Sequence, residues 1–205
     1  MTVTALARTF ATLRAFTRER PAVEWCDLCA AALDSAHDHL LASDTRQLRC
    51  ACAACALVLG GAPGTRWTRV PRRVQRLVDL RLPDETWQML ALPVELAFLV
   101  RRGAQGRVVA VYPSPGGPVE ASVPPAAWDG LVAANLCLAG LRVDVEALLV
   151  NRTGARRDHY LLSIDECYRL VGLLRRHWRG FSGGGDVQER IARFFAELDA
   201  AAGGA

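Results

Sequence analysis

Five of the seven cysteines in this 205-residue chain lie within thirty residues of one another, and this clustering constrains the fold more than any other feature. They form two Cys-x2-Cys pairs, Cys26 with Cys29 and Cys52 with Cys55, while Cys50 precedes the second pair. Each pair can form a tight turn that directs two sulfurs to one point, and two pairs supply the four soft ligands of a tetrahedral zinc site. The spacing therefore predicts a metal site made by Cys26, Cys29, Cys52 and Cys55.

Other uses of clustered cysteines fit the sequence less well. Five cysteines are an odd number for disulfides, and the first sixteen residues have no apolar core typical of a signal peptide, so we expect a cytoplasmic protein. A thioredoxin-like pair would leave the group between Cys50 and Cys55 unexplained. The familiar iron–sulfur spacings do not occur here. We therefore favour zinc as the cofactor and keep an iron–sulfur cluster as the alternative.

The residues between the two pairs predict the shape of the metal module. A polar stretch at residues 42–45 separates two segments that can pair as a hairpin, and the alanine-rich run after Cys50 favours a helix. Knuckle, hairpin and helix in this order are typical of a treble clef. Cys50 could replace Cys52 as a ligand or lie beside the site as a buried thiol. His37 and His39 are the other metal-binding side chains nearby, and the sequence leaves their roles open.

A shell closed by four sulfurs has no position for water or substrate, so we expect the metal to be structural. The usual catalytic motifs are absent from the sequence, including G-x-S-x-G, H-E-x-x-H and G-x-G-x-x-G. All 25 basic residues are arginines, so lysine-dependent phosphate loops and Schiff bases are impossible. We find no catalytic constellation and therefore predict that the protein is not an enzyme.

The glycine-rich segment at residues 60–64 marks the expected domain boundary. We assign residues 1–62 to an N-terminal helix and zinc-binding module, and residues 63–205 to an α+β domain. Alternating apolar residues predict that this domain contains a mainly antiparallel sheet. The expected strands are Val74–Leu82, Val94–Arg101, Arg107–Tyr112, Val119–Val123, Leu141–Val150 and His159–Leu162. In Leu141–Val150 the alternation predicts a strand that is covered on one face only.

Three helices are expected in the same domain. One begins at Pro125 and ends at Gly140. Ser163 and Asp186 each start a capping box followed by an apolar stripe, and the glycines between the two stripes predict a C-terminal helical hairpin. Cys137 and Cys167 fall in helical segments, where we expect buried thiols.

The net charge of +4 is concentrated in one segment, since the chain outside residues 63–83 has nearly balanced charges. Six arginines face one acid there: Arg66, Arg69, Arg72, Arg73, Arg76 and Arg81. This arginine strip beside a zinc module raises the alternative of a nucleic-acid-binding zinc protein. A global charge this small argues against general phosphate binding, and we do not expect nucleic acid as a partner. No apolar run reaches the ~20 residues that span a bilayer.

Several motifs together resemble an uncharacterised bacterial family whose members are encoded near uptake [NiFe]-hydrogenase subunits. They are Cys26–Cys29, His37 to Leu41, Arg49 to Cys55, Ile164–Gly172 and Trp178–Gly184. The resemblance covers nearly the whole chain and supplies no catalytic residues. It implies an accessory role, in hydrogenase assembly or as a small complex subunit.

The segment around Trp178 and Arg179 has the aromatic and arginine composition of an interface hot spot, next to a glycine-rich loop. We therefore predict that Trp178 and Arg179 bind a protein partner, with a packed corner of the fold as the alternative for this turn. The resemblance implies hydrogenase subunits or maturation factors as the first candidates. The expected function is that of a zinc-stabilised, non-enzymatic accessory protein. An iron–sulfur electron-transfer subunit is the alternative from another class.

Overall fold

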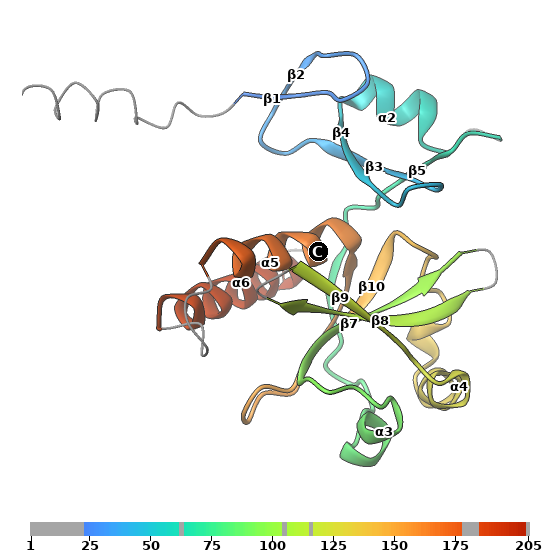
Figure 1. Ribbon diagram of the computed structural model, residues 1–205, viewed down its shortest axis with the longest axis vertical. Helices are drawn as coiled ribbons and strands as arrows, with labels where there is room; N and C mark the ends of the chain where they lie inside the picture. Colours follow the sequence, from blue (N-terminus) through green and yellow to red (C-terminus); the bar gives the residue numbers. More distant parts are fainter. Residues whose placement is uncertain (1–22, 62–63, 104–105, 115–116, 178–184, 204–205) are drawn as a thin grey trace, which may run out of the picture.

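The computed structural model of the chain describes residues 23–61, 64–103, 106–114, 117–177 and 185–203. A small cysteine-rich module lies at one end, and a larger body built around one sheet lies below it (Figure 1). The elements of the module are β1 (Glu24–Trp25), β2 (Ala32–Leu33), β3 (Asp38–Ala42), β4 (Leu48–Ala51), α2 (Ala53–Leu59) and β5 (Trp67–Arg69). Strands β1 and β2 form a hairpin, and the three-stranded sheet has the order β4-β3-β5.

The module contains a knuckle, a hairpin and a helix in the predicted order. The polar stretch connects β3 to β4, which pair antiparallel, and α2 follows β4 directly. Strand β5 comes from beyond residue 62 and pairs with β3, so the module's sheet extends past the proposed boundary at residues 62–63. That boundary stays a prediction, and the expected N-terminal helix falls among residues 1–22, outside the described residues.

The body contains a six-stranded antiparallel sheet of order β6-β11-β10-β7-β8-β9. Its strands are β6 (Val74–Arg76), β7 (Leu96–Arg102), β8 (Arg107–Ser114), β9 (Gly117–Ser122), β10 (Glu146–Asn151) and β11 (Asp158–Ser163). Its helices are α3 (Asp84–Met89), α4 (Pro125–Ala134), the 3-10 helix η1 (Leu136–Leu138), α5 (Ile164–His177) and α6 (Gly185–Gly203). These elements confirm the predicted α+β class with antiparallel strands.

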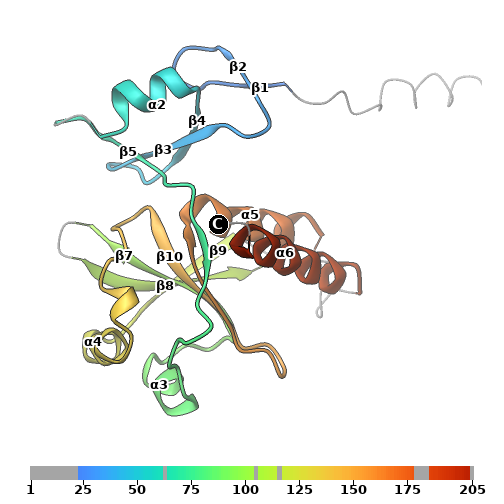
Figure 2. The ribbon, with the colours of Figure 1, turned by 180° about the vertical axis from the view of Figure 1, so that it is seen from behind.

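Helices cover both faces of the sheet, as the two opposite views show (Figures 1 and 2). One core forms under α5 and α6 and includes Phe98 and Leu149, while a second core forms near α4 and η1 and includes Leu99 and Leu148. Consecutive residues of β7 and β10 thus enter different cores because side chains alternate across a strand. The central strands are therefore buried on both faces.

This burial corrects the prediction for residues 141–150. The strand begins only at Glu146, and all of its positions are buried, so the expected strand with one solvent face is wrong. The predicted long helix from Pro125 is also wrong in its second half, because α4 ends at Ala134. Asn135, with φ −142° and ψ 82°, leaves the helical conformation, and its side-chain Nδ2 donates to the carbonyl of Leu131.

The C-terminal helices agree better with prediction. α5 begins at Ile164 and α6 includes the stripe from Val187 to Leu198, and both helices pack their apolar residues on the same core. Cys167 is buried as expected, whereas Cys137 is exposed, contrary to the prediction. The predicted Val74–Leu82 strand is shortened to Val74–Arg76. Helix α3, which begins after Pro83, was not anticipated from the sequence.

Candidate metal centre

The first cysteine pair lies on a tight knuckle between β1 and β2. The Cys26 N–H donates to the carbonyl of Ala31 (2.8 Å), and the Ala30 N–H donates to the carbonyl of Cys26 (2.8 Å). Ala30 has φ 56°, a left-handed conformation that usually favours glycine. The knuckle thus turns the chain back on itself directly after Cys29.

The second pair lies at the start of α2. Cys52 is the N-cap residue, and its Sγ accepts a hydrogen bond from the N–H of Cys55 (3.5 Å). The free N–H groups and the dipole of a helix N-terminus stabilise negative sulfur. Cys52 lies outside β4, and its sulfur groups with those of the other paired cysteines, whereas Cys50 groups with two histidines.

The structure brings the four predicted ligands together. The sulfurs of Cys26, Cys29, Cys52 and Cys55 all lie within 4.8 Å of one another. The Cys29 and Cys52 sulfurs are 3.7 Å apart. Four sulfurs at ~2.3 Å from a tetrahedral zinc ion are separated by about 3.8 Å. The arrangement fits a four-sulfur zinc site, and none of the seven cysteines forms a disulfide.

The electrostatics of the cluster favour a cation. Burial raises the pKa of Cys26, but the N–H groups of Cys52, Leu28 and Cys29 outweigh it and lower that pKa to about 6. Sharing of hydrogen bonds with Cys29 and Cys52 raises the pKa of Cys55 to about 12. A single thiolate thus forms easily and discourages its neighbours from losing their protons. A divalent ion would relieve this repulsion and hold all four as thiolates.

The module has little other means of holding its shape. In the part of the module that the structure describes, its own apolar cluster has three buried residues, Leu40, Ala51 and Ala56, with a few partly buried side chains around them. Asp27 ties the knuckle to β4, because its carboxylate accepts from the Cys50 N–H (2.8 Å) and its N–H donates to the Cys50 carbonyl (2.9 Å). A core this small needs further crosslinks, which a metal would provide.

Cys50 and the two histidines form a second cluster. One donor atom each of His37, His39 and Cys50 lies within 4.8 Å of the other two. His39 and Cys50 are partners across β3 and β4, so their side chains extend from the same face of the sheet. Leu40 and Ala51, one residue further along each strand, face α2 instead. The structure thus separates Cys50 from the other four cysteines, a point that the sequence left open.

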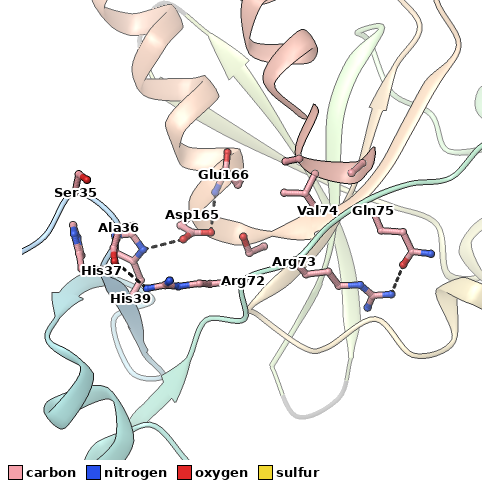
Figure 3. A pocket seen from close by; sticks show the side chains of 13 residues that line it. Ser35, Ala36, His37, His39, Arg72, Arg73, Val74, Gln75, Asp165 and Glu166 are labelled. Carbon is pink, nitrogen blue, oxygen red and sulfur yellow. Dashed lines mark hydrogen bonds and ion pairs between the residues drawn. The ribbon is translucent and has the colours of Figure 1, made fainter. Parts of the chain in front are cut away.

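A pocket of about 860 Å³ lies beside this second cluster, between the module and the body. Its lining comes from the approach to β3, from the segment that joins β5 to β6, and from the start of α5 (Figure 3). The Arg72 guanidinium donates to the carbonyl of Ala36 (3.2 Å), and the His39 Nδ1–H donates to the Asp165 carboxylate (2.8 Å). Sequence reasoning missed Asp165 as a neighbour of the cysteine module.

The arginine strip connects the two parts of the molecule. Arg69 and Arg72 both pair with Asp38 of the module, Arg73 pairs with the buried Glu146, and Arg76 pairs with Asp158 and Asp199. Arg66 pairs with Asp44. Five of the six side chains thus have carboxylate partners inside the protein. This pairing supports an architectural role for the strip.

Two predicted site residues cannot be placed, since Trp178 and Arg179 lie outside the described residues. Among the helices that the structure describes, none combines the length and apolar character needed to cross a membrane.

Comparison with known proteins places the chain in a family. The model of the Family of unknown function (DUF5947) matches residues 25–202, and the chain therefore belongs to this family. The match includes the five clustered cysteines, His37, His39 and the whole six-stranded sheet. No curated protein and no solved structure matches the chain.

Proposed function

We propose that this protein is a zinc-stabilised accessory protein that acts by binding another protein. The observation that carries the proposal is the convergence of the Cys26, Cys29, Cys52 and Cys55 sulfurs within 4.8 Å. Zinc on these four thiolates has no position left for a substrate, so its role is to fold the module. The module then presents a rigid surface, which loses little entropy on docking.

Exposed apolar side chains on the module support the partner role. Trp25 on β1 is 57% exposed, and Leu57 and Val58 on α2 are 77% and 68% exposed. Burial of such side chains under a partner lowers the free energy of the complex, and tryptophan is enriched in interface hot spots. Trp178 and Arg179 remain the sequence-based candidates for further contacts. The sequence resemblance makes hydrogenase subunits and maturation factors the first partners to test.

Metal content tests the structural half of the proposal. Cys26→Ser and Cys55→Ser should each lose the zinc of the four-sulfur site and become protease-sensitive in the module. The reason is that the free energy of metal binding is what folds the module. Cys137→Ser is the matched control, since Cys137 is an exposed cysteine on the body. Full zinc content and wild-type protection in either site variant would refute that ligand.

Co-expression with the candidate partners tests the binding half. Trp25→Ala and Leu57→Ser should reduce co-purification of the partner at least tenfold while zinc content and melting temperature stay unchanged. Leu136→Ser is the control, because Leu136 is equally exposed on the body, at 79%. Trp178→Ala and Arg179→Ala test the sequence-based contacts in the same assay. Failure of every candidate to co-purify with the wild-type chain would remove the hydrogenase proposal.

A further inference from the structure

The cluster of His37, His39 and Cys50 carries an inference that does not depend on the proposed partner role. His39 and Cys50 are partners across β3 and β4, His37 lies directly before β3, and the two imidazole rings meet edge to face with centroids 4.9 Å apart. Imidazole nitrogen and thiolate sulfur are both ligands that zinc binds well. The question is whether their donor atoms are free to bind a metal.

Among the described residues, the hydrogen bonds of the two rings involve Nδ1 and leave Nε2 of each ring available. The Nδ1–H of His37 donates to the carbonyl of Asp34 (2.9 Å), and the Nδ1–H of His39 donates to Asp165 (2.8 Å). With Nδ1 protonated, a neutral imidazole has its lone pair on Nε2. A carbonyl or carboxylate behind the ring is the usual support of a metal-binding histidine, because it fixes the tautomer and the ring orientation.

The Nε2 atom of His37 provides a second and independent observation. The His37 side chain is only 8% exposed, and its Nε2 is buried without a hydrogen-bond partner among the described residues. Buried polar atoms nearly always have a partner, so this nitrogen needs a ligand. One ring nitrogen of His37, one ring nitrogen of His39 and the Cys50 sulfur lie within 4.8 Å of one another, so the second ring and the thiol are the candidate co-ligands.

We propose that His37 Nε2, His39 Nε2 and the Cys50 sulfur form a second metal site, which binds zinc and is separate from the four-cysteine site. Three protein ligands leave a fourth coordination position for water or another small donor. A pocket of about 380 Å³ at the cluster gives this position access to solvent, and it is lined also by Glu24, Leu48, Glu166 and Arg169.

The site would also connect the two parts of the molecule. Its ligands belong to β3, β4 and the segment before β3, and the support for His39 comes from Asp165 at the start of α5. A metal there would hold the module's sheet directly against the body. Asp165 is a positioning residue in this account, since it acts on the metal through His39.

Cobalt substitution of the full-length chain tests the proposal. Metal-free protein should bind two Co²⁺ per chain, one with the intense sulfur-to-metal absorption of a four-thiolate site and one with weaker absorption. Cys50→Ser and His37→Gln should each bind one Co²⁺ and keep the four-thiolate bands. Asp165→Asn should retain both sites with the second weakened by roughly 10- to 100-fold.

The controls are Cys137→Ser and His177→Gln, which change the same residue types on the body and should bind two ions. A wild-type stoichiometry of one, or two ions in Cys50→Ser, would overturn the second site. The four-thiolate bands are recorded in the same sample, so failure of the second site is distinguished from failure of the first. Retention of those bands also shows that a variant has kept the module folded.

Discussion

The Nδ1 atom of His39 lies 2.8 Å from a carboxylate oxygen of Asp165, although the two residues are 126 positions apart. The hydrogen bond to Asp165 raises the pKa of His39. Burial raises the pKa of Asp165, but the hydrogen bonds from His39, Ser163 and the Glu166 backbone together outweigh it and lower that pKa. Both side chains are about one-quarter exposed. This pair joins β3 of the cysteine module to the first turn of α5.

Asp165→Ala should therefore weaken the attachment of the module. Loss of a partly buried, charge-assisted hydrogen bond predicts a decrease of roughly 1.5–3 kcal/mol in the free energy of unfolding. Urea unfolding of the zinc-loaded protein measures it, and hydrogen exchange should increase along β3. Asp129→Ala, at an exposed position of α4, is the control and should have little effect. Equal stability of the two variants would show that the pair contributes nothing.

The knuckle offers a test of local strain. Ala30 has a positive φ of 56°, which costs an alanine about 1–2 kcal/mol, whereas glycine adopts it freely. Ala30→Gly should relieve this strain. The stability gained in this way should exceed the stability lost because glycine makes the unfolded chain more flexible. The neighbouring Ala31→Gly gains flexibility without relief. We predict that Ala30→Gly is about 1 kcal/mol more stable than Ala31→Gly, and a reversed order in urea unfolding would contradict the observed turn.

His159 predicts a pH dependence of stability. Burial and the charge of Arg152 lower its pKa below the ordinary value of 6.5. The unfolded chain therefore takes up a proton at a higher pH than the folded chain, so stability is present above pH 6.5 and is lost as the pH falls toward the folded pKa. His159→Leu should remove this loss. The stability of wild type relative to His159→Leu should decrease between pH 7 and pH 5, and a constant difference would rule out the lowered pKa.

The arginine strip predicts weak affinity for nucleic acid. Guanidinium nitrogens of Arg69 and Arg72 lie 3.0 and 3.7 Å from a carboxylate oxygen of Asp38, so both charges already have a partner. We expect no measurable binding of duplex DNA or RNA at physiological salt, where weak phosphate contacts are screened. Fluorescence anisotropy of labelled duplexes measures this affinity. Micromolar binding that is lost in Arg69→Gln and Arg72→Gln would favour a nucleic-acid-binding protein instead.

The four-cysteine cluster could be predicted because its geometry is local. A Cys-x2-Cys pair sets the distance between its own sulfurs, and the sequence between Cys29 and Cys52 indicates how the pairs are joined. The C-terminal helices could be predicted for the same reason, since the apolar residues of α5 and α6 recur every three to four positions, as on one face of a helix.

Features that depend on distant packing could not be predicted in this way. The alternating segment begins at residue 141, before β10 starts at Glu146. The strand itself is buried on both faces because it lies in the middle of the sheet, and the sequence does not reveal this position. The cluster of His37, His39 and Cys50 required the register of β3 and β4. The alternation of His37 and His39 was its one signal in the sequence. Asp165 lies 126 residues from His39 and gave none.

Metal analysis of the full-length protein purified without oxygen tests the central claim most directly. Elemental analysis and an absorption spectrum are recorded on the same sample of wild type and Cys55→Ser. The account predicts a colourless, zinc-containing protein in which Cys55→Ser loses the zinc held by the four sulfurs. A brown, iron-containing protein with visible absorption, or a folded protein that holds no metal, would contradict it.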